Sequence, residues 1–511
     1  MQNNDKKVLL RISNLKQYFP LKGGRFVKAN DGITLDIYEG ETFGLVGESG
    51  CGKSTLGRTI LQLYHQTYGR TMYYGRSLDD LAPKYVIDTV KNLKSRRTKL
   101  RELEQKRDKL EAEYAKLSEK EQYAKHGELD AARKLAEDAL LDITKIVGGF
   151  LVVDDLDPVI AAYSKDYAIA RKLSSMEEKR QELQVDMDDA EYAKKTAEEA
   201  GKSGKDGQLQ KAQEKLKQCD DQIAALRAQL DAGRKEIEAL RAPYANDPEF
   251  QKYEAYRDDG IDLARLEYNE MRRLRRDMQL IFQDPYSSLN PRMSVGQIIS
   301  EGMQAHNMIK KKDARMQEMV LKIMDDCGLA PYFLHRFPHQ FSGGQRQRIG
   351  IARALATKPK FVVCDEAVSA LDVSIQAQII NLLLDLKEQQ NLTYMFITHD
   401  LSVVKYISDR VGVMYLGTMV ELAAADEIFH HPIHPYTEAL LNAIPTTDTV
   451  GAKELSILEG DIPSPVNPPK GCKFHTRCKY CTEICTQVVP EWEEVRPNHF
   501  VACHHKLEAK E

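Results

Sequence analysis

The chain has 511 residues, of which 42% are hydrophobic and 29% charged, so it is long enough for about two to four structural units with substantial cores. Its formal net charge of −4 gives no general argument for binding nucleic acid or an anionic membrane surface. No apolar run reaches the roughly 18 residues of a transmembrane helix, and the first residues lack the apolar core and cleavage site of a signal peptide, so we expect a cytosolic protein.

Short apolar runs separated by glycine-rich turns fill residues 8–46 and predict antiparallel β-structure. A further strand is expected at residues 70–74. Tyr18 and Phe19 lie in the first of these regions. One of the two rings can stack on a nucleotide base, or both can be ordinary strand residues, and the sequence leaves the two interpretations open.

A glycine-rich loop follows a short apolar strand expected at residues 41–46 and precedes a helix expected at residues 56–63. This context and the pattern G-x-x-x-x-G-K-[ST] predict a phosphate-binding P-loop, in which backbone N–H groups and the helix N-terminus face phosphate oxygens. Lys53 is expected to reach the β- and γ-phosphates of ATP, and Ser54 to offer its hydroxyl to Mg²⁺. The loop residues expected to bind the nucleotide are Gly47, Glu48, Ser49, Gly50, Cys51, Gly52, Lys53, Ser54 and Thr55.

The composition changes between about Lys84 and Leu266, where Lys, Glu, Ala, Gln and Leu dominate and heptads are visible. The clearest run has at its core positions Leu209, Ala212, Leu216, Cys219, Ile223, Leu226, Leu230, Ile237 and Leu240. That period of 3.5 residues favours a coiled coil over solvated charged helices. Glycines interrupt the helices at residues 148–149 and 201–207, and the second interruption is expected to be a hairpin tip. An antiparallel helical arm and a compact helical bundle both fit this pattern.

Strands and helices alternate after residue 274, which predicts a largely parallel, doubly wound sheet with its chemistry at the carboxyl ends of the strands. One helical stretch is expected from residue 295 to about residue 329, and another helix begins near residue 345. Strands are expected within 278–285, at 360–366, at 394–400 and, as the final one, at 411–415.

Two carboxylates end the strand expected at residues 360–366. Asp365 is placed to hold Mg²⁺ directly or through water, and Glu366 to polarise the water that attacks the γ-phosphate.

Several motifs follow one another in a specific order: the P-loop, then those at 282–285, 341–345, 365–366, 369–372 and His399. In this order the chain resembles the nucleotide-binding subunits of ABC transporters. It resembles most closely the ATP-binding subunits of oligopeptide and dipeptide permeases, and the detailed match lies in residues 282–292, 434–441 and 471–478. The inserted helices lie outside this resemblance.

The resemblance implies roles for further residues. Gln283 would sense Mg²⁺ and the attacking water, and His399 would contact the γ-phosphate. A second phosphate-binding turn would serve the nucleotide held by an opposite subunit, with Asp372 at the junction, so that two such domains enclose two ATP molecules. The nucleotide-binding residues of this turn are Ser342, Gly343, Gly344 and Gln345. Phe341 and Ala367 stand where most members have Leu and Pro, but neither change removes a reacting group.

Five of the nine cysteines lie in the last forty residues. Cys472, Cys478, Cys485 and Cys503 match positions at which some members of the resembling family carry a [4Fe–4S] cluster. Zinc with help from nearby histidines, or free thiols in a small packed tail, are the alternatives. Cys481 is an additional thiol between them.

We therefore expect four segments: the P-loop part of an ABC ATPase domain at 1–83, the helical insertion at 84–266, the rest of the ATPase domain at 267–430, and a cysteine-rich extension at 431–511. The insertion is either a tolerated surface excursion or a docking arm.

The resemblance implies an ATPase at the cytoplasmic face of the membrane that energises peptide uptake. Its partners would be two transmembrane permease subunits, a second ATPase subunit, for which the family favours a paralogue, and an extracytoplasmic peptide-binding protein. No nucleic acid partner is expected. Import of nickel or other small solutes is one alternative. A DNA-associated mechanical ATPase is the other, because inserted helices also occur in such proteins.

Overall fold

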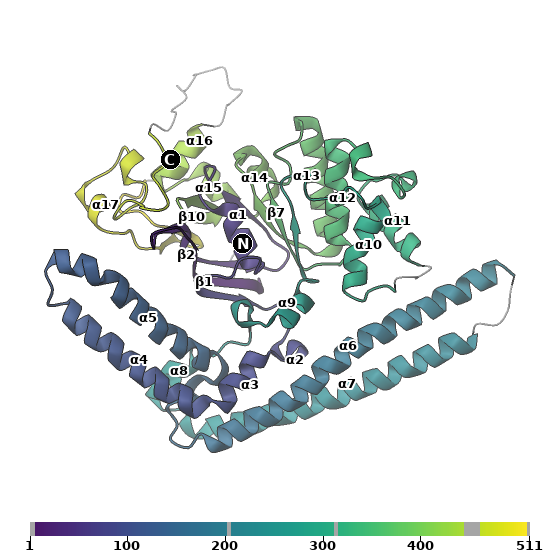
Figure 1. Cartoon of the computed structure of the whole chain (residues 1–511), viewed down its shortest axis with the longest axis horizontal. Helices are drawn as coiled ribbons and strands as arrows, with labels where there is room; N and C mark the ends of the chain where they lie inside the picture. The colour runs from purple at the N-terminus through teal and green to yellow at the C-terminus, as the bar shows by residue number, and fades with distance from the viewer. Residues whose placement is uncertain (1–5, 202–205, 311–314, 444–459, 508–511) are drawn as a thin grey trace. The chain divides into compact units, whose positions relative to one another are not determined.

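The computed structural model describes residues 6–201, 206–310, 315–443 and 460–507. The chain divides into two compact units, which Figure 1 shows in one view. Residues 1–75 and 272–511 make the first, which we name the sheet unit, and residues 76–271 make the second, which we name the helical unit. Within the described residues, no helix is both long and apolar enough to cross a membrane.

An eight-stranded sheet forms the centre of the sheet unit, in the order β11-β12-β10-β9-β3-β8-β7-β6. The five strands from β9 to β6 are parallel, which confirms the predicted largely parallel sheet, and the other three are antiparallel. The strands are β3 (Thr42–Val46), β6 (Met278–Ile281), β7 (Phe361–Asp365), β8 (Thr393–Ile397), β9 (Arg410–Tyr415), β10 (Thr418–Ala424), β11 (Glu493–Arg496) and β12 (His499–Val501).

The strand at residues 410–415 is not the last one, so that prediction is wrong. Leu416 and Gly417 both have positive φ values, 41° and 79°, and make the two-residue turn that joins β9 to β10. Leucine is an unusual residue at such a position, which hid the hairpin in the sequence.

A second sheet of the same unit carries β1 (Val8–Pro20) between β2 (Phe26–Tyr38) and β4 (Tyr68–Tyr73), with antiparallel pairing on both sides. This confirms the antiparallel prediction for residues 8–38 and the strand predicted near residue 70. Residues 42–46 differ, because β3 joins the parallel sheet instead.

Helices cover the parallel strands and bury a core that includes Val295, Ile349 and Ile379. The predicted single helix over 295–329 is wrong: α10 ends at Ala305, and α11 begins at Met316. Asn307, with φ 54°, and the bond from the Met308 N–H to the Met303 carbonyl stop α10 in a Schellman motif. The helices are α1 (Lys53–Ile60), α10 (Val295–Ala305), α11 (Met316–Asp326), α12 (Gly343–Leu355), α13 (Val373–Gln390), α14 (Leu401–Ile407), α15 (Ala425–His430), α16 (Pro435–Asn442) and α17 (Glu483–Gln487).

The helical unit contains two pairs of long helices: α4 (Leu93–Tyr114) with α5 (Glu119–Val147), and α6 (Asp157–Glu199) with α7 (Asp206–Arg241) (Figure 1). The expected hairpin tip between α6 and α7 falls largely on residues 202–205, outside the described residues. All buried residues of α7 except Arg241 follow the predicted heptad phase: Leu216, Cys219, Ile223, Leu230, Gly233 and Ile237.

Candidate functional site

The P-loop lies between a fully buried strand, β3, and the first turn of α1. Gly52 caps α1 with φ 102°, and a Cβ added there would lie 2.1 Å from the Ala29 carbonyl oxygen. A Cβ at Gly47 would lie 2.2 Å from the carbonyl oxygen of Met414 on β9. Both positions therefore require glycine, because backbone atoms that cannot move aside fill the space.

Lys53 is buried and closes the loop, since its Nζ donates to the carbonyl oxygens of Gly47 at 2.8 Å and Glu48 at 3.0 Å. The next residue, Ser54, donates from Oγ to Oδ1 of Asp365 at 2.5 Å. The parallel pairing of β7 with β8, and of β8 with β3, brings Asp365 and Ser54 to one edge of the sheet although 311 residues separate them.

Asp365 is 1% exposed, and its other carboxylate oxygen, Oδ2, accepts from Nη2 of Arg58 at 3.1 Å. A hydroxyl and a carboxylate oxygen in contact are the hard oxygen donors that Mg²⁺ prefers. Ser54 and Asp365, two of the three residues predicted to contact this ion, therefore fit it.

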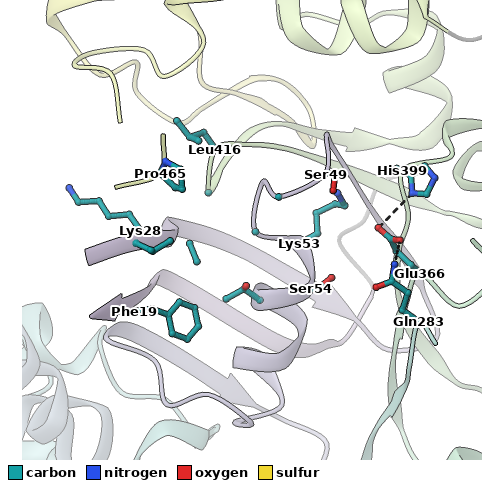
Figure 2. A pocket seen from close by; sticks show the side chains of 16 residues that line it. Phe19, Lys28, Ser49, Lys53, Ser54, Gln283, Glu366, His399, Leu416 and Pro465 are labelled. Atoms are coloured by element: carbon teal, nitrogen blue, oxygen red, sulfur yellow. Dashed lines mark hydrogen bonds and ion pairs between the residues drawn. The ribbon is translucent and has the colours of Figure 1, made fainter. Parts of the chain in front are cut away.

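Glu366 follows Asp365 and is the centre of a three-residue cluster, which Figure 2 shows. Its Oε2 accepts from Nε2 of Gln283 at 2.6 Å, and its Oε1 lies 3.6 Å from Nδ1 of His399. The backbone of Glu366 has φ 47°, and its N–H donates to the Ile397 carbonyl at 2.9 Å. Such a conformation is costly for a residue other than glycine and is typical of functional sites. The structure thus brings together the three predicted catalytic side chains.

A cavity of ≈ 550 Å³ joins this cluster to the P-loop. Its volume is in the range of small-molecule sites. Of the two candidate rings, Phe19 lines the cavity and Tyr18 does not; the hydroxyl of Tyr18 donates to Asp31 at 2.6 Å. The lining residues are Phe19, Val27, Lys28, Ala29, Ser49, Gly50, Gly52, Lys53, Ser54, Thr55, Gln283, Glu366, His399, Leu416, Gly417 and Pro465.

Three residues that line the cavity could not be predicted from any motif in the sequence. Lys28 comes from β2, Leu416 from the β9–β10 turn, and Pro465 from the C-terminal extension. None belongs to a local motif, and only the folded chain assembles them.

The second predicted phosphate-binding turn does not line the cavity. Ser342 is the N-cap of α12 and forms a capping box with Gln345, and Asp372 is the N-cap of α13. The two helix starts are neighbours, because a Cβ at Gly344 would lie 2.5 Å from Cγ2 of Ile375. Asp372 therefore lies beside the turn formed by Ser342, Gly343, Gly344 and Gln345, and neither lines the cavity that contains the P-loop of the same chain.

The nine cysteines are free. In the tail, the Cys472 N–H donates to the Cys485 carbonyl at 2.8 Å. Burial raises the pKa of Cys472 to about 11 and that of Cys503 to about 12, so these thiols are protonated at neutral pH. Across the described part of the chain, no group of three or more His, Cys, Asp or Glu side chains is placed to hold a metal ion. The arrangement of thiols therefore does not by itself fit an Fe–S cluster.

A P-loop, an adjacent serine–aspartate pair and a glutamate at a strand end define a P-loop nucleoside triphosphatase. The profile described as "ABC transporter" matches residues 30–251 and 251–369, and that described as "Oligopeptide/dipeptide transporter, C-terminal region" matches residues 420–485. The chain belongs to the ABC transporter family, within its group of oligopeptide and dipeptide transporter ATP-binding subunits.

Two relatives from Bacillus subtilis (strain 168) illustrate the similarity. The oligopeptide transport ATP-binding protein AppF is 52% identical over 250 residues, which cover 48% of this chain and 75% of AppF. YkfD, which is also named as an oligopeptide transport ATP-binding protein, is 34% identical over 498 residues. These residues cover 97% of this chain and 95% of YkfD. The match to YkfD therefore includes most of the helical unit.

Among solved structures, cbiO1 from Clostridium perfringens, part of an ABC transporter complex, has a TM-score of 0.40 at 16% identity and covers 83% of this chain and 92% of its own.

Proposed function

We propose that this chain is the ATP-hydrolysing subunit of an importer that energises peptide uptake across the cytoplasmic membrane. The observation that carries the ATPase assignment is the convergence of Glu366, Gln283 and His399 on one cavity with Lys53 and Ser54. Peptides as cargo rest on the names of AppF and YkfD and on the matched C-terminal region. Neither metal chelates nor DNA has comparable support.

The chain's own groups have separable tasks in this reaction. Loop N–H groups and Lys53 bind the phosphates, and Phe19 stacks on the base. Ser54 and Asp365 would hold Mg²⁺, which when bound neutralises charge on the β- and γ-phosphates. Glu366 accepts a proton from the attacking water.

Gln283 and His399 contact the two carboxylate oxygens of Glu366 from different segments of the chain, which orients the base toward the cavity.

The replacement Glu366→Gln tests this assignment. It keeps the shape and the hydrogen bond to Gln283 but removes the base, so we expect ATP binding to persist while turnover in the assembled transporter falls at least about 100-fold. Glu388→Gln, on the exposed side of α13, removes the same charge away from the site and should leave turnover unchanged. Near wild-type turnover in the Glu366→Gln complex refutes Glu366 as the base.

The positions of Ser342, Gly343, Gly344, Gln345 and Asp372 outside the chain's own cavity support the proposal that they complete the site of a second ATPase subunit. We propose a paralogue in that place, two transmembrane permease subunits, and an extracytoplasmic peptide-binding protein. The chain would then be peripheral at the cytoplasmic face. Purification of tagged Glu366→Gln protein from membranes in MgATP tests these partners, and recovery without any membrane protein contradicts them.

Two finer parts of the proposal concern the insertion and the tail. The buried heptad positions of α7 support a coiled coil, which would dock another subunit. A [4Fe–4S] cluster on Cys472, Cys478, Cys485 and Cys503 stays a prediction. Anaerobic reconstitution with iron and sulfide, followed by absorbance near 400 nm, tests it, and a colourless product contradicts it.

A further inference from the structure

Glu48, inside the P-loop, is held by the C-terminal extension (residues 431–511). Its carboxylate makes a two-point pair with Arg477, with Nη1–Oε2 at 2.7 Å and Nη2–Oε1 at 3.0 Å. Its backbone N–H donates to the Tyr436 hydroxyl at 2.9 Å. Its carbonyl, on the loop side, accepts from Lys53 Nζ at 3.0 Å and from the Cys51 N–H at 3.3 Å. One residue therefore links the extension to the phosphate-binding lysine.

The Arg477 side chain is built into this position. It is 4% exposed, its guanidinium carbon lies 5.9 Å from the centroid of the Tyr415 ring, and its bonds to Glu48 raise its pKa above the usual value. Phe474 packs against Tyr415 and Tyr436, with each pair of ring centroids 5.2 Å apart. A planar two-point pair of this kind fixes direction as well as charge. The extension thus holds Arg477 in a fixed orientation against Glu48 of the P-loop.

The same extension reaches the cavity at two further points. Nζ of Lys473 donates to the Leu416 carbonyl at 3.2 Å and pairs with Asp31 at 3.1 Å. The carbonyl of Pro465, itself a wall of the cavity, accepts from the Lys28 N–H at 3.1 Å. The extension therefore contacts both the phosphate end and the far wall of the site.

We propose that Arg477 is a positioning residue of the nucleotide site: by holding Glu48 from behind, it fixes the P-loop turn that presents Lys53, so that the C-terminal extension sets the affinity for ATP. This inference rests on the proposed ATP-binding function. Arg477 itself does not line the cavity and acts through Glu48.

The test measures the affinity of the purified full-length chain for a fluorescent ATP analogue with Mg²⁺, together with its melting temperature. Arg477→Met should weaken binding about tenfold or more, a usual size for coupling between sites. Arg477→Lys should recover part of the loss, because it keeps the charge without the fork. Lys479→Met is the matched control, since Lys479 is in the same extension and pairs with Glu438 at 3.1 Å, away from the P-loop. It should bind as wild type does.

Glu48→Gln tests the pair from its other side, should Arg477→Met not fold. The double variant should bind no more weakly than Arg477→Met alone, because both changes break one interaction. The inference is wrong if Arg477→Met binds the analogue within twofold of the wild-type affinity. If Arg477→Met does not fold, the same result for Glu48→Gln overturns it. Additive losses of affinity in the double variant also overturn it. A wild-type chain that binds no nucleotide instead refutes the proposed function.

Discussion

At the scale of single residues, the residue that follows β7 has an unfavourable backbone conformation. Glu366 has φ 47°, and bonds on both sides of it maintain that conformation: its N–H donates to the Ile397 carbonyl, and its carbonyl accepts from the Ser369 hydroxyl at 3.0 Å. The conformation costs about 1–3 kcal/mol, which the surrounding β7 and β8 strands must offset. In this conformation, the Glu366 carboxylate contacts Gln283 and His399.

His434 gives a pH prediction at the same scale. Burial lowers its pKa to about 4, and the opposing effect of Glu421 is smaller. Its neutral Nδ1 caps α16 by accepting from the Tyr436 N–H at 3.0 Å. Because the unfolded chain binds a proton near pH 6.5 and the folded chain only near pH 4, the stabilising contribution is complete above pH 6.5 and is lost as the pH falls through 4.

The full effect is about 3 kcal/mol over that window. His434→Asn keeps a capping oxygen but does not titrate. Its melting temperature should therefore fall less steeply between pH 7 and pH 4.5 than that of the wild type. Parallel slopes in thermal unfolding of the two proteins contradict the assignment.

At the scale of elements, the helical unit builds its own core. Phe150 and Phe250 pack edge to face with centroids 5.7 Å apart, and the guanidinium of Arg241 lies 4.5 Å from the Phe150 ring. The Arg241 side chain also donates to the Tyr163 hydroxyl at 2.6 Å, which ties the end of α7 to α6. All residues of the nucleotide cavity belong to the sheet unit. Binding of ATP and the function of the inserted helices should therefore be separable.

Replacement of residues 84–266 by a short flexible linker tests that separation. We expect the shortened chain to keep the ATP affinity of the wild type within about threefold, because no cavity residue is removed, and to lose assembly with its partners or transport if the insertion is a docking arm. Equilibrium binding and a transport assay in cells measure the two properties. Normal assembly and transport contradict the docking hypothesis, and the insertion is then a tolerated excursion.

At the scale of the whole molecule, the sequence predicted those parts of the site whose geometry is local. The P-loop specifies its own turn through Gly47 and Gly52, and Glu366 follows from its place at a strand end. The walls at Lys28 and Pro465 and the support from Arg477 were not predictable, because segments far apart in the chain meet there only after folding. The β9–β10 hairpin was missed for a different reason, namely that its turn contains leucine rather than Asn or Asp.

The different positions of Lys53 and Ser342 lead to a prediction about assembly with a second ATPase subunit. Lys53 and Ser342 are both expected to bind ATP, but only Lys53 lines the chain's own cavity. Ser342→Arg should therefore leave the ATP affinity of the isolated chain unchanged, whereas Lys53→Ala should weaken it at least about tenfold. In the assembled transporter, Ser342→Arg should still abolish stimulated turnover if the proposed composite site exists, because the bulky side chain then fills the turn at the N-terminus of α12 that would receive the second subunit's nucleotide.

Equilibrium binding to each isolated variant and ATPase activity of each purified complex are the measurements. A loss of affinity in isolated Ser342→Arg would place the turn in the chain's own site. Wild-type turnover in its complex would mean that hydrolysis does not need a composite site between two subunits. The expected pair of results, binding retained and turnover lost, arises only if the chain contributes one surface to its own nucleotide and a different surface to its partner's.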